Sequence, residues 1–453
     1  MSPFVKASIV IVDIAIFIAL LLFLPFETKI NQALAILIFV AILWLSEALH
    51  VTITALLIPI LAACMGLMST SKALNSFADS NIFLFFGGFA LAAAMHYQEL
   101  DKIIARKVLA LARGNFALSI LYIFSVTAFL SMWMSNTATA AMMLPLALGM
   151  LSNVDPKENR STYVFVLLGV AFSASIGGIG TLVGTPPNAI VATNLNITFS
   201  EWLKYGIPMV IIFMPLMIVT LYAVCKPKLK QEVTMQIEDI PMDLKKYITL
   251  AIFAFVAILW IFSAKIEPFL SSLLNLKKID SFDSIIAIGA AILVCSFGVI
   301  KWTKVQENTD WGVLMLFGGG ITLSVILKDS GASKLLADGI ANLIKDQNVF
   351  LIALVISFFI VFLTEFTSNT ASAALLVPLF ISIAPAFGVP ELGLALIIAI
   401  GASCAFMLPV ATPPNAIVFG TGHIKQSEMV KVGIYLNIAC SFIIAIAAYY
   451  FWL

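Results

Sequence analysis

The stretch SNTATAAMMLP at residues 135–145 is the clearest indication of the fold in this chain. It returns as SNTASAALLVP at residues 368–378, with seven of the eleven positions identical. Both stretches lie deep inside apolar sequence, where hydrocarbon offers polar groups no hydrogen-bond partners. The two Ser-Asn-Thr triplets therefore need partners from within the protein or from something that the protein binds.

The composition predicts a polytopic membrane protein. The chain has 453 residues, of which 62% are hydrophobic and only 11% charged, and its mean hydropathy is +1.08. A soluble domain carries about 25% charged residues. The five cysteines are scattered without metal-ligand or disulfide spacing, and a net charge of +1 gives no reason to expect a nucleic-acid partner.

Apolar runs long enough to cross a bilayer predict an all-α fold of about eleven transmembrane helices. Two further runs, 115–151 and 348–387, are too long for one span and are interrupted by the triplets. We expect re-entrant hairpins with Ser-Asn-Thr at the tip, and a pair of short spans in each run is the alternative. Segments 99–113 and 328–346 have the spacing of amphipathic helices at the membrane surface. The eleven predicted spans are 7–25, 31–47, 51–68, 80–98, 162–181, 206–224, 247–264, 283–300, 311–327, 390–410 and 431–452.

Several other motifs recur in the same order as the triplets, which indicates an internal duplication. Phe86-Gly-Gly returns at Phe317, and TPPNAIV at residues 185–191 returns at residues 412–418. Five predicted crossings separate the span at 80–98 from its counterpart at 311–327, so the second copy is inverted. Inverted repeats with broken helices that meet near the midplane are typical of secondary transporters.

The duplication also sets the predicted organisation. We expect a first transmembrane helix in 1–30, repeat 1 in 31–224 with hairpin 115–151, a cytoplasmic linker in 225–246, and repeat 2 in 247–453 with hairpin 348–387. The larger share of the 25 Lys and Arg residues falls in segments that are cytoplasmic if the N-terminus is inside. This bias predicts a cytoplasmic N-terminus and an external C-terminus.

The Thr-Pro-Pro-Asn motifs predict breaks in two helices. Proline lacks an N–H and disfavours helical geometry in the residue before it. The motifs should therefore free the carbonyl oxygens of the preceding residues, which suit a hard cation such as sodium. The N–H groups at the start of the helix after each triplet favour an anion instead. The carbonyls expected to be free are those of Val183, Gly184, Thr185, Val410, Ala411 and Thr412.

No Lys or Arg lies in these motifs, so the charge of a bound anion would be met by helix ends, polar side chains and bound cations. Glu365 is the one acid beside a triplet, and its counterpart is Met132, so it lies outside the duplicated set. A titrating role for Glu365 stays open. We assign no role to His50, His96 and His423, and we expect Gly87-Gly88 and Gly318-Gly319 to be close helix contacts or hinges.

With these motifs in view, the sequence resembles the divalent anion/sodium symporter family over nearly the whole chain. The resemblance implies a homodimer in a bacterial inner membrane. It also implies a scaffold (about 1–113 and 247–346) and a transport part (about 115–224 and 348–453) that moves as an elevator. It further implies site residues. The first sodium site would use Ser131, Ser135, Asn136 and the carbonyl of Gly184; the second would use Thr364, Ser368, Asn369 and the carbonyl of Ala411; the substrate would meet Asn136, Thr137, Asn369, Thr370, Thr185, Thr412, Pro186 and Pro413.

The functional hypothesis is sodium-coupled symport of a small di- or tricarboxylate of the succinate, malate and fumarate class. Sodium is co-transported, and no organic cofactor is expected. One alternative is an exchanger or a proton-coupled carrier of the same fold, with citrate or sulfate among its possible substrates. Another is a passive anion channel, although the charged rings or constriction of a pore are not visible. An enzyme is not expected, because no nucleophile–base pair or metal-ligand cluster is found in the sequence.

Overall fold

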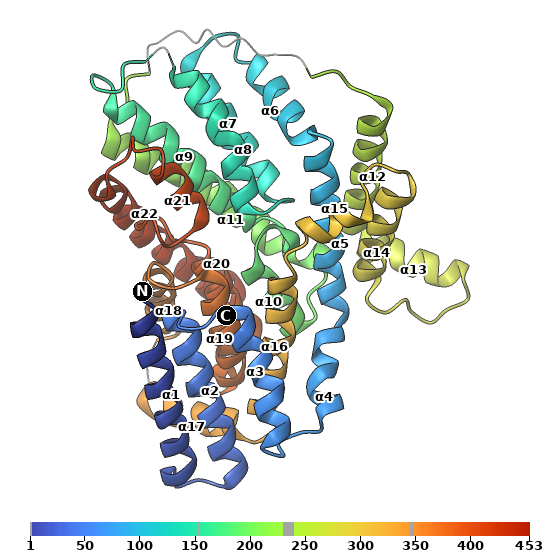
Figure 1. The fold of residues 1–453 in the computed structure, drawn as a ribbon, viewed down its shortest axis with the longest axis vertical. Coiled ribbons are helices and arrows are strands. Elements are labelled where there is room, and N and C mark those ends of the chain that lie inside the picture. Colours follow the sequence, from blue (N-terminus) through green and yellow to red (C-terminus); the bar gives the residue numbers. More distant parts are fainter. Residues whose placement is uncertain (1, 153, 230–239, 345–347) are drawn as a thin grey trace.

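The computed structural model describes residues 2–152, 154–229, 240–344 and 348–453, and these fold into helices without strands (Figure 1). The described helices of the first half are α1 (Pro3–Phe23), α2 (Thr28–Ser46), α3 (Val51–Cys64), α4 (Thr70–Asn75), η1 (Ser76–Ala78), α5 (Ser80–Tyr97), α6 (Leu100–Ala110), α7 (Phe116–Ser131), α8 (Asn136–Leu151), α9 (Arg160–Gly178), η2 (Leu182–Gly184), α10 (Pro186–Leu195) and α11 (Phe199–Cys225). Those of the second half are α12 (Leu244–Ile261), α13 (Ser263–Leu273), α14 (Phe282–Ser296), α15 (Trp302–Asn308), α16 (Trp311–Asp329), α17 (Ala332–Ile344), α18 (Val349–Leu363), α19 (Asn369–Ile383), η3 (Ala384–Phe387), α20 (Glu391–Ala402), α21 (Pro413–Phe419), α22 (Gln426–Ala447) and η4 (Ala448–Trp452).

The all-α membrane fold predicted from the sequence is confirmed. Among the described residues, nine helical stretches are long and apolar enough to cross a membrane, and six further apolar helices are shorter. Each of the eleven predicted spans overlaps one of the described helices. Helices α6 and α17 form within segments 99–113 and 328–346, whereas α4, α13 and α15 were not expected. That α6 and α17 lie along the membrane surface stays a prediction. Residues 230–239 of the predicted linker 225–246 lie outside the described residues.

The two predicted hairpins are built from short helices. The arms α7 and α8 have 16 residues each, and α18 and α19 have 15 each. At 1.5 Å per residue these arms are about 24 Å long, less than the roughly 30 Å of a hydrocarbon core. Figure 1 shows α7 and α8 in the upper half of the molecule and α18 and α19 in the lower half. Helix length alone does not separate a re-entrant hairpin from a pair of short spans, so the hairpins stay a prediction.

Helices of the two repeats exchange partners reciprocally. Helix α3 packs against α16, and α14, which occupies the same place in the second repeat, packs against α5. Likewise α10 packs against α19 and α20, and its counterpart α21 packs against α8 and α9. Such reciprocal contacts are what two copies related by a pseudo-two-fold axis would make. Helices α10 and α21 are therefore each held by the helix that follows the Ser-Asn-Thr triplet of the other repeat, α19 and α8 respectively.

The glycine pairs provide the close helix contacts that the sequence analysis predicts. A Cβ on Gly87 in α5 would overlap the backbone of Ala287 in α14. A Cβ on Gly319 in α16 would overlap the backbone and side chain of Ala55 in α3. Small residues at such positions let helix backbones approach closely within a membrane, where apolar burial drives association only weakly.

Gly87→Ala should therefore lower the free energy of unfolding by about 1–3 kcal/mol, the usual cost of overpacking a tight contact. The matched control is Gly289→Ala on α14, where an added Cβ would meet no heavy atom within 4 Å. Thermal unfolding of the purified variants in detergent measures both effects. Equal midpoints for the two variants would contradict the close contact.

Candidate functional site

The two Ser-Asn-Thr triplets begin helices in the same manner. Ser135 has extended backbone geometry and caps α8, its Oγ accepting the N–H of Ala138 at 3.2 Å. Ser368 caps α19, its Oγ accepting the N–H of Ala371 at 3.4 Å. Asn136 and Asn369 are consequently the first residues of their helices. Each triplet places the positive end of a helix dipole and backbone donors at the tip, which favours an anion.

A buried hydroxyl lies behind each asparagine. Ser131 Oγ is 2.7 Å from Asn136 Oδ1 and 2.7 Å from the carbonyl oxygen of Ala174. Thr364 Oγ1 is 2.6 Å from Asn369 Oδ1 and 3.0 Å from the carbonyl oxygen of Ala402. Each hydroxyl has one proton for these two acceptors, so at least one acceptor is less than fully paired. Each triplet is thus backed by three converging oxygen atoms, the donor type that hard cations prefer.

The Thr-Pro-Pro-Asn motifs lie at breaks between helices, as predicted, but the prolines themselves start the next helix. Helix α9 ends at Gly178, and α10 begins at Pro186. In the second repeat α20 ends at Ala402, and α21 begins at Pro413. Proline suits the first position of a helix because its fixed φ is helical and its missing N–H would be unpaired there. The unwound segment therefore precedes the prolines.

Two of the carbonyls predicted to be free are paired. The carbonyl of Thr185 accepts the N–H of Asn188 at 3.2 Å, and that of Thr412 accepts the N–H of Ala416 at 3.1 Å. The prediction is wrong for these two groups because the helix that starts at each proline closes its first turn back onto the threonine. The free-carbonyl prediction remains for the residues before each threonine.

The asparagine of each motif bridges the unwound segment before it. Asn188 Nδ2 donates to the carbonyls of Gly178 at 2.9 Å and Thr181 at 2.7 Å. Asn415 Nδ2 makes the corresponding bonds, to Ala405 and Leu408, at 3.0 Å each. Both amide groups are fully buried. This bridging role does not follow from the motif's residue types, although the presence of the asparagine in both copies of the motif is a signal for a role of its own.

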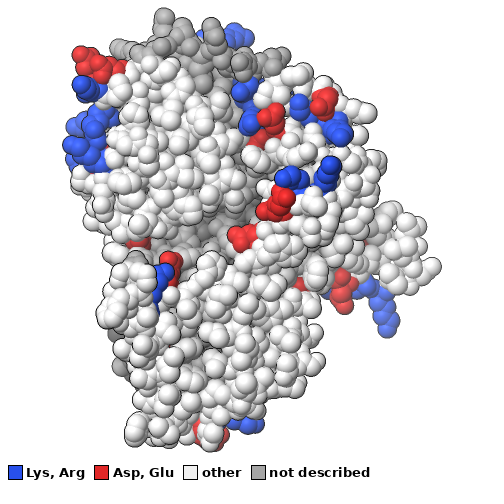
Figure 2. Space-filling model, in the orientation of Figure 1, with Lys and Arg blue, Asp and Glu red and all other residues white. Residues whose placement is uncertain are grey.

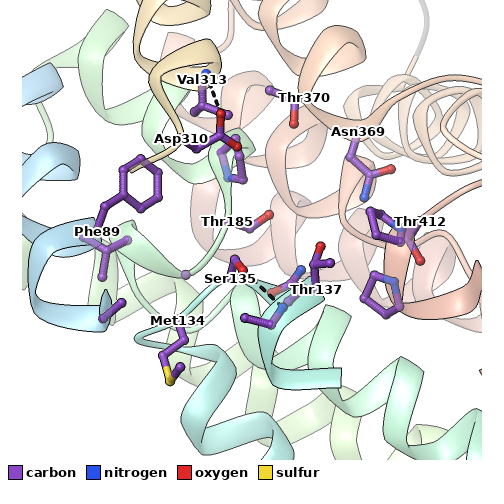
Figure 3. Close-up of a pocket in the computed structure, with 18 of the residues that line it drawn as sticks. Phe89, Met134, Ser135, Thr137, Thr185, Asp310, Val313, Asn369, Thr370 and Thr412 are labelled. Carbon is purple, nitrogen blue, oxygen red and sulfur yellow. Dashed lines mark hydrogen bonds between the residues drawn. The ribbon is translucent and has the colours of Figure 1, made fainter. Parts of the chain in front are cut away.

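All eight residues predicted to meet the substrate line one cavity of about 1040 Å³. In Figure 3, Ser135 and Thr137 lie on one side of it, Asn369 and Thr370 lie on the other, and Thr185 and Thr412 lie between them. Ser135, Gly184, Ser368 and Ala411 also line the cavity, whereas Ser131 and Thr364 are buried behind it. The structure therefore brings together residues that are more than 200 positions apart in the sequence.

Another part of the cavity wall, here called the far wall, is formed by residues outside the repeated motifs. Phe89, His96, Asp310 and Val313 line the cavity, and Glu47 and Glu307 lie there too. His96, which was assigned no role, is 2.7 Å from Asp101 through Nδ1. No lysine or arginine occurs among the described residues that line this cavity. Figure 2 shows a hollow between the upper and lower halves of the molecule, with acidic side chains at its margin.

Residues 41–401 match the family model described as citrate transporter. The chain belongs to this citrate transporter family. It is 65% identical to a transporter of Haemophilus influenzae, over 98% of this chain and 97% of the relative. It is 32% identical to the sodium-dependent dicarboxylate transporter SdcS of Staphylococcus saprophyticus, over 96% of this chain and 88% of the relative.

A solved structure shows the same fold. The YdaH transporter of Alcanivorax borkumensis superposes with a TM-score of 0.57 at 12% identity, covering 83% of this chain and 87% of that one. This likeness concerns the fold alone. The family match and the named relatives identify the chain as a multi-pass membrane transporter of the citrate and dicarboxylate family and not an enzyme.

The bridging asparagines give a testable consequence. Asn188→Ala and Asn415→Ala should each lower the free energy of unfolding by about 1–3 kcal/mol, because buried carbonyls lose their donor. Asn194→Ala is the control, since Asn194 Nδ2 donates only to Ile190 of its own helix in the described hydrogen bonds. Chemical or thermal unfolding in detergent checks the difference. Bridging variants as stable as the control would remove the proposed bracing of the unwound segments.

Proposed function

We propose that this family member couples the uptake of a small di- or tricarboxylate, of the succinate, malate and fumarate class, to sodium symport. The observation that carries the proposal is the meeting of two helix N-termini, one from each inverted repeat, in one cavity without a lysine or arginine among its described lining residues. A dicarboxylate carries two negative charges, and two positive helix ends suit it. The name of the relative SdcS supports the sodium-dependent dicarboxylate class.

Sodium would complete the electrostatics of this site. Helix dipoles contribute only partial charges, so a dianion in a low-dielectric cavity needs further positive charge. The first sodium would be held by Ser131, Ser135, Asn136 and the Gly184 carbonyl. The second would be held by Thr364, Ser368, Asn369 and the Ala411 carbonyl. The oxygen clusters behind Asn136 and Asn369 support this assignment. Coupling then follows because each ligand supplies charge that the other requires.

Alternating access would be of the elevator type, with residues of about 115–224 and 348–453 moving against about 1–113 and 247–346. The packing of α8 and α9 on α21, and of α19 and α20 on α10, supports a transport part built from both repeats. The contacts of α3 with α16 and of α5 with α14 support a separate scaffold. We further propose a homodimer in a bacterial inner membrane, with its N-terminus in the cytoplasm.

Uptake of labelled succinate into proteoliposomes tests this function. An inward sodium gradient should drive accumulation, and replacing sodium with potassium should abolish it. Asn136→Ala and Asn369→Ala should each reduce uptake at least about tenfold, because each removes a ligand from the substrate site and from one sodium site. Asn194→Ala should leave uptake unchanged.

Several outcomes would contradict the proposal. No sodium dependence with any C4 dicarboxylate, citrate or sulfate would remove sodium symport. Uptake that follows a proton gradient, or that needs an internal counter-anion, would favour the proton-coupled carrier or the exchanger. Near-normal uptake by both asparagine variants would remove the site assignment. Currents far above carrier turnover would indicate a channel.

A further inference from the structure

Glu365 is a buried acid in the loop between α18 and α19 that the transport scheme above does not use. It follows Thr364 and lies three residues before the cap Ser368, and its side chain is fully buried. The equivalent position of the first repeat holds Met132. The two copies of the motif therefore differ in charged character at this position, beside the second proposed sodium site.

Four hydrogen-bond donors surround this carboxylate. Oε1 accepts the N–H of Phe406 at 2.7 Å, the N–H of Met407 at 2.8 Å and Asn437 Nδ2 at 2.7 Å. Oε2 accepts the N–H of Leu408 at 2.9 Å. Three successive backbone N–H groups of this kind form a concave anion site, and hydrogen bonds to an ionised acceptor are the strong ones. The shell of donors suits a carboxylate that carries its charge.

In the first repeat, two of the three corresponding backbone N–H groups are paired without an acid. There the N–H groups of Ile179 and Gly180 donate to the carbonyls of Ile176 and Gly177, at 3.1 and 2.9 Å, which extends the end of α9. The side chain of Met132 lies where a Cβ on Gly180 would be. In the second repeat the same N–H groups turn away from their own helix to Glu365. The charge is thus specific to one half of the molecule.

The segment held by Glu365 leads directly to the second proposed sodium site. Leu408 accepts the N–H of Ala411 at 3.2 Å, and the carbonyl of Ala411 is a proposed ligand. Asn415 holds the same segment through the carbonyls of Ala405 and Leu408. On the other side, Thr364 contacts Asn369. Glu365 therefore holds the segment that leads to the Ala411 carbonyl, and it directly follows Thr364, a proposed ligand on the other side of that site.

We propose that Glu365 is a positioning residue whose charge makes the second sodium site bind more tightly than the first, so that sodium occupies the second site before the first. This inference rests on the sodium-coupled function proposed above. An opposite charge acts more strongly in a low-dielectric interior than in water. The first site has the apolar Met132 in this place and lacks that contribution. The two symmetric ligand sets thus acquire different affinities and an order of binding.

Sodium binding to the purified full-length protein tests the inference. The thermal midpoint is measured in detergent against sodium concentration, with potassium keeping the ionic strength constant. Glu365→Gln should raise the half-saturating sodium concentration at least about tenfold, since it removes the charge and one acceptor. Glu365→Asp keeps the charge and should raise it much less. Met132→Leu, at the matched position, should leave it unchanged.

Each outcome is decisive. A folded Glu365→Gln protein with the wild-type half-saturating sodium concentration overturns the inference. A Glu365→Asp protein that binds sodium as weakly as Glu365→Gln also overturns it, because a purely structural role of Glu365 would explain that result. A wild-type protein that sodium stabilises no better than potassium overturns the sodium coupling itself, and this inference with it.

A second pair of variants applies if Glu365→Gln does not fold. Thr364→Ala and Ser131→Ala remove equivalent hydroxyls from the two sites and leave Glu365 in place. Thr364→Ala should abolish the rise of the thermal midpoint that occurs at the lower sodium concentrations, where the tighter site fills. Ser131→Ala should preserve that rise. Equal effects, or the reverse order, would overturn the inference.

Discussion

Unwound backbone inside a membrane needs hydrogen-bond partners, and this requirement shapes the centre of the molecule. Helices α9 and α20 both stop inside the protein, and the residues after them cannot donate to lipid. The structure replaces the missing helical bonds with side chains. Asn188 and Asn415 donate to the carbonyls on one side of each break, and Glu365 accepts the N–H groups of the second break. These braces keep the backbone at the cavity in a non-helical form.

The helix starts at the two triplets create the chemistry of the site. Helices α8 and α19, capped by Ser135 and Ser368, present N–H donors to the cavity, and acceptor oxygens lie behind Asn136 and Asn369. Donors suit a carboxylate, and oxygens suit sodium. Since the described cavity lining holds no lysine or arginine, the proposed anion and cation sites depend on each other's charge.

The sequence predicted those features that depend on pattern. Hydropathy located the helices, and the repeated Ser-Asn-Thr and Thr-Pro-Pro-Asn motifs identified residues that line one cavity. It placed the break at the prolines rather than before them, because proline disrupts a helix interior but also starts a helix well. The far wall of the cavity, which includes Asp310 and Phe89, forms where segments with different sequences pack together. These residues belong to no repeated motif, so the sequence alone did not indicate them. The pairing of Met132 with Glu365 was visible as an asymmetry, but the four donors around the carboxylate required coordinates.

The central claim is that the anion and sodium occupy one site whose parts come from both repeats. The most direct test is the equilibrium binding of succinate to the purified protein by calorimetry, in sodium and in potassium at equal ionic strength. Succinate should bind at least about tenfold more tightly in sodium, and succinate should tighten sodium binding by the same factor, as linkage requires. Equal succinate affinity in the two salts would contradict it.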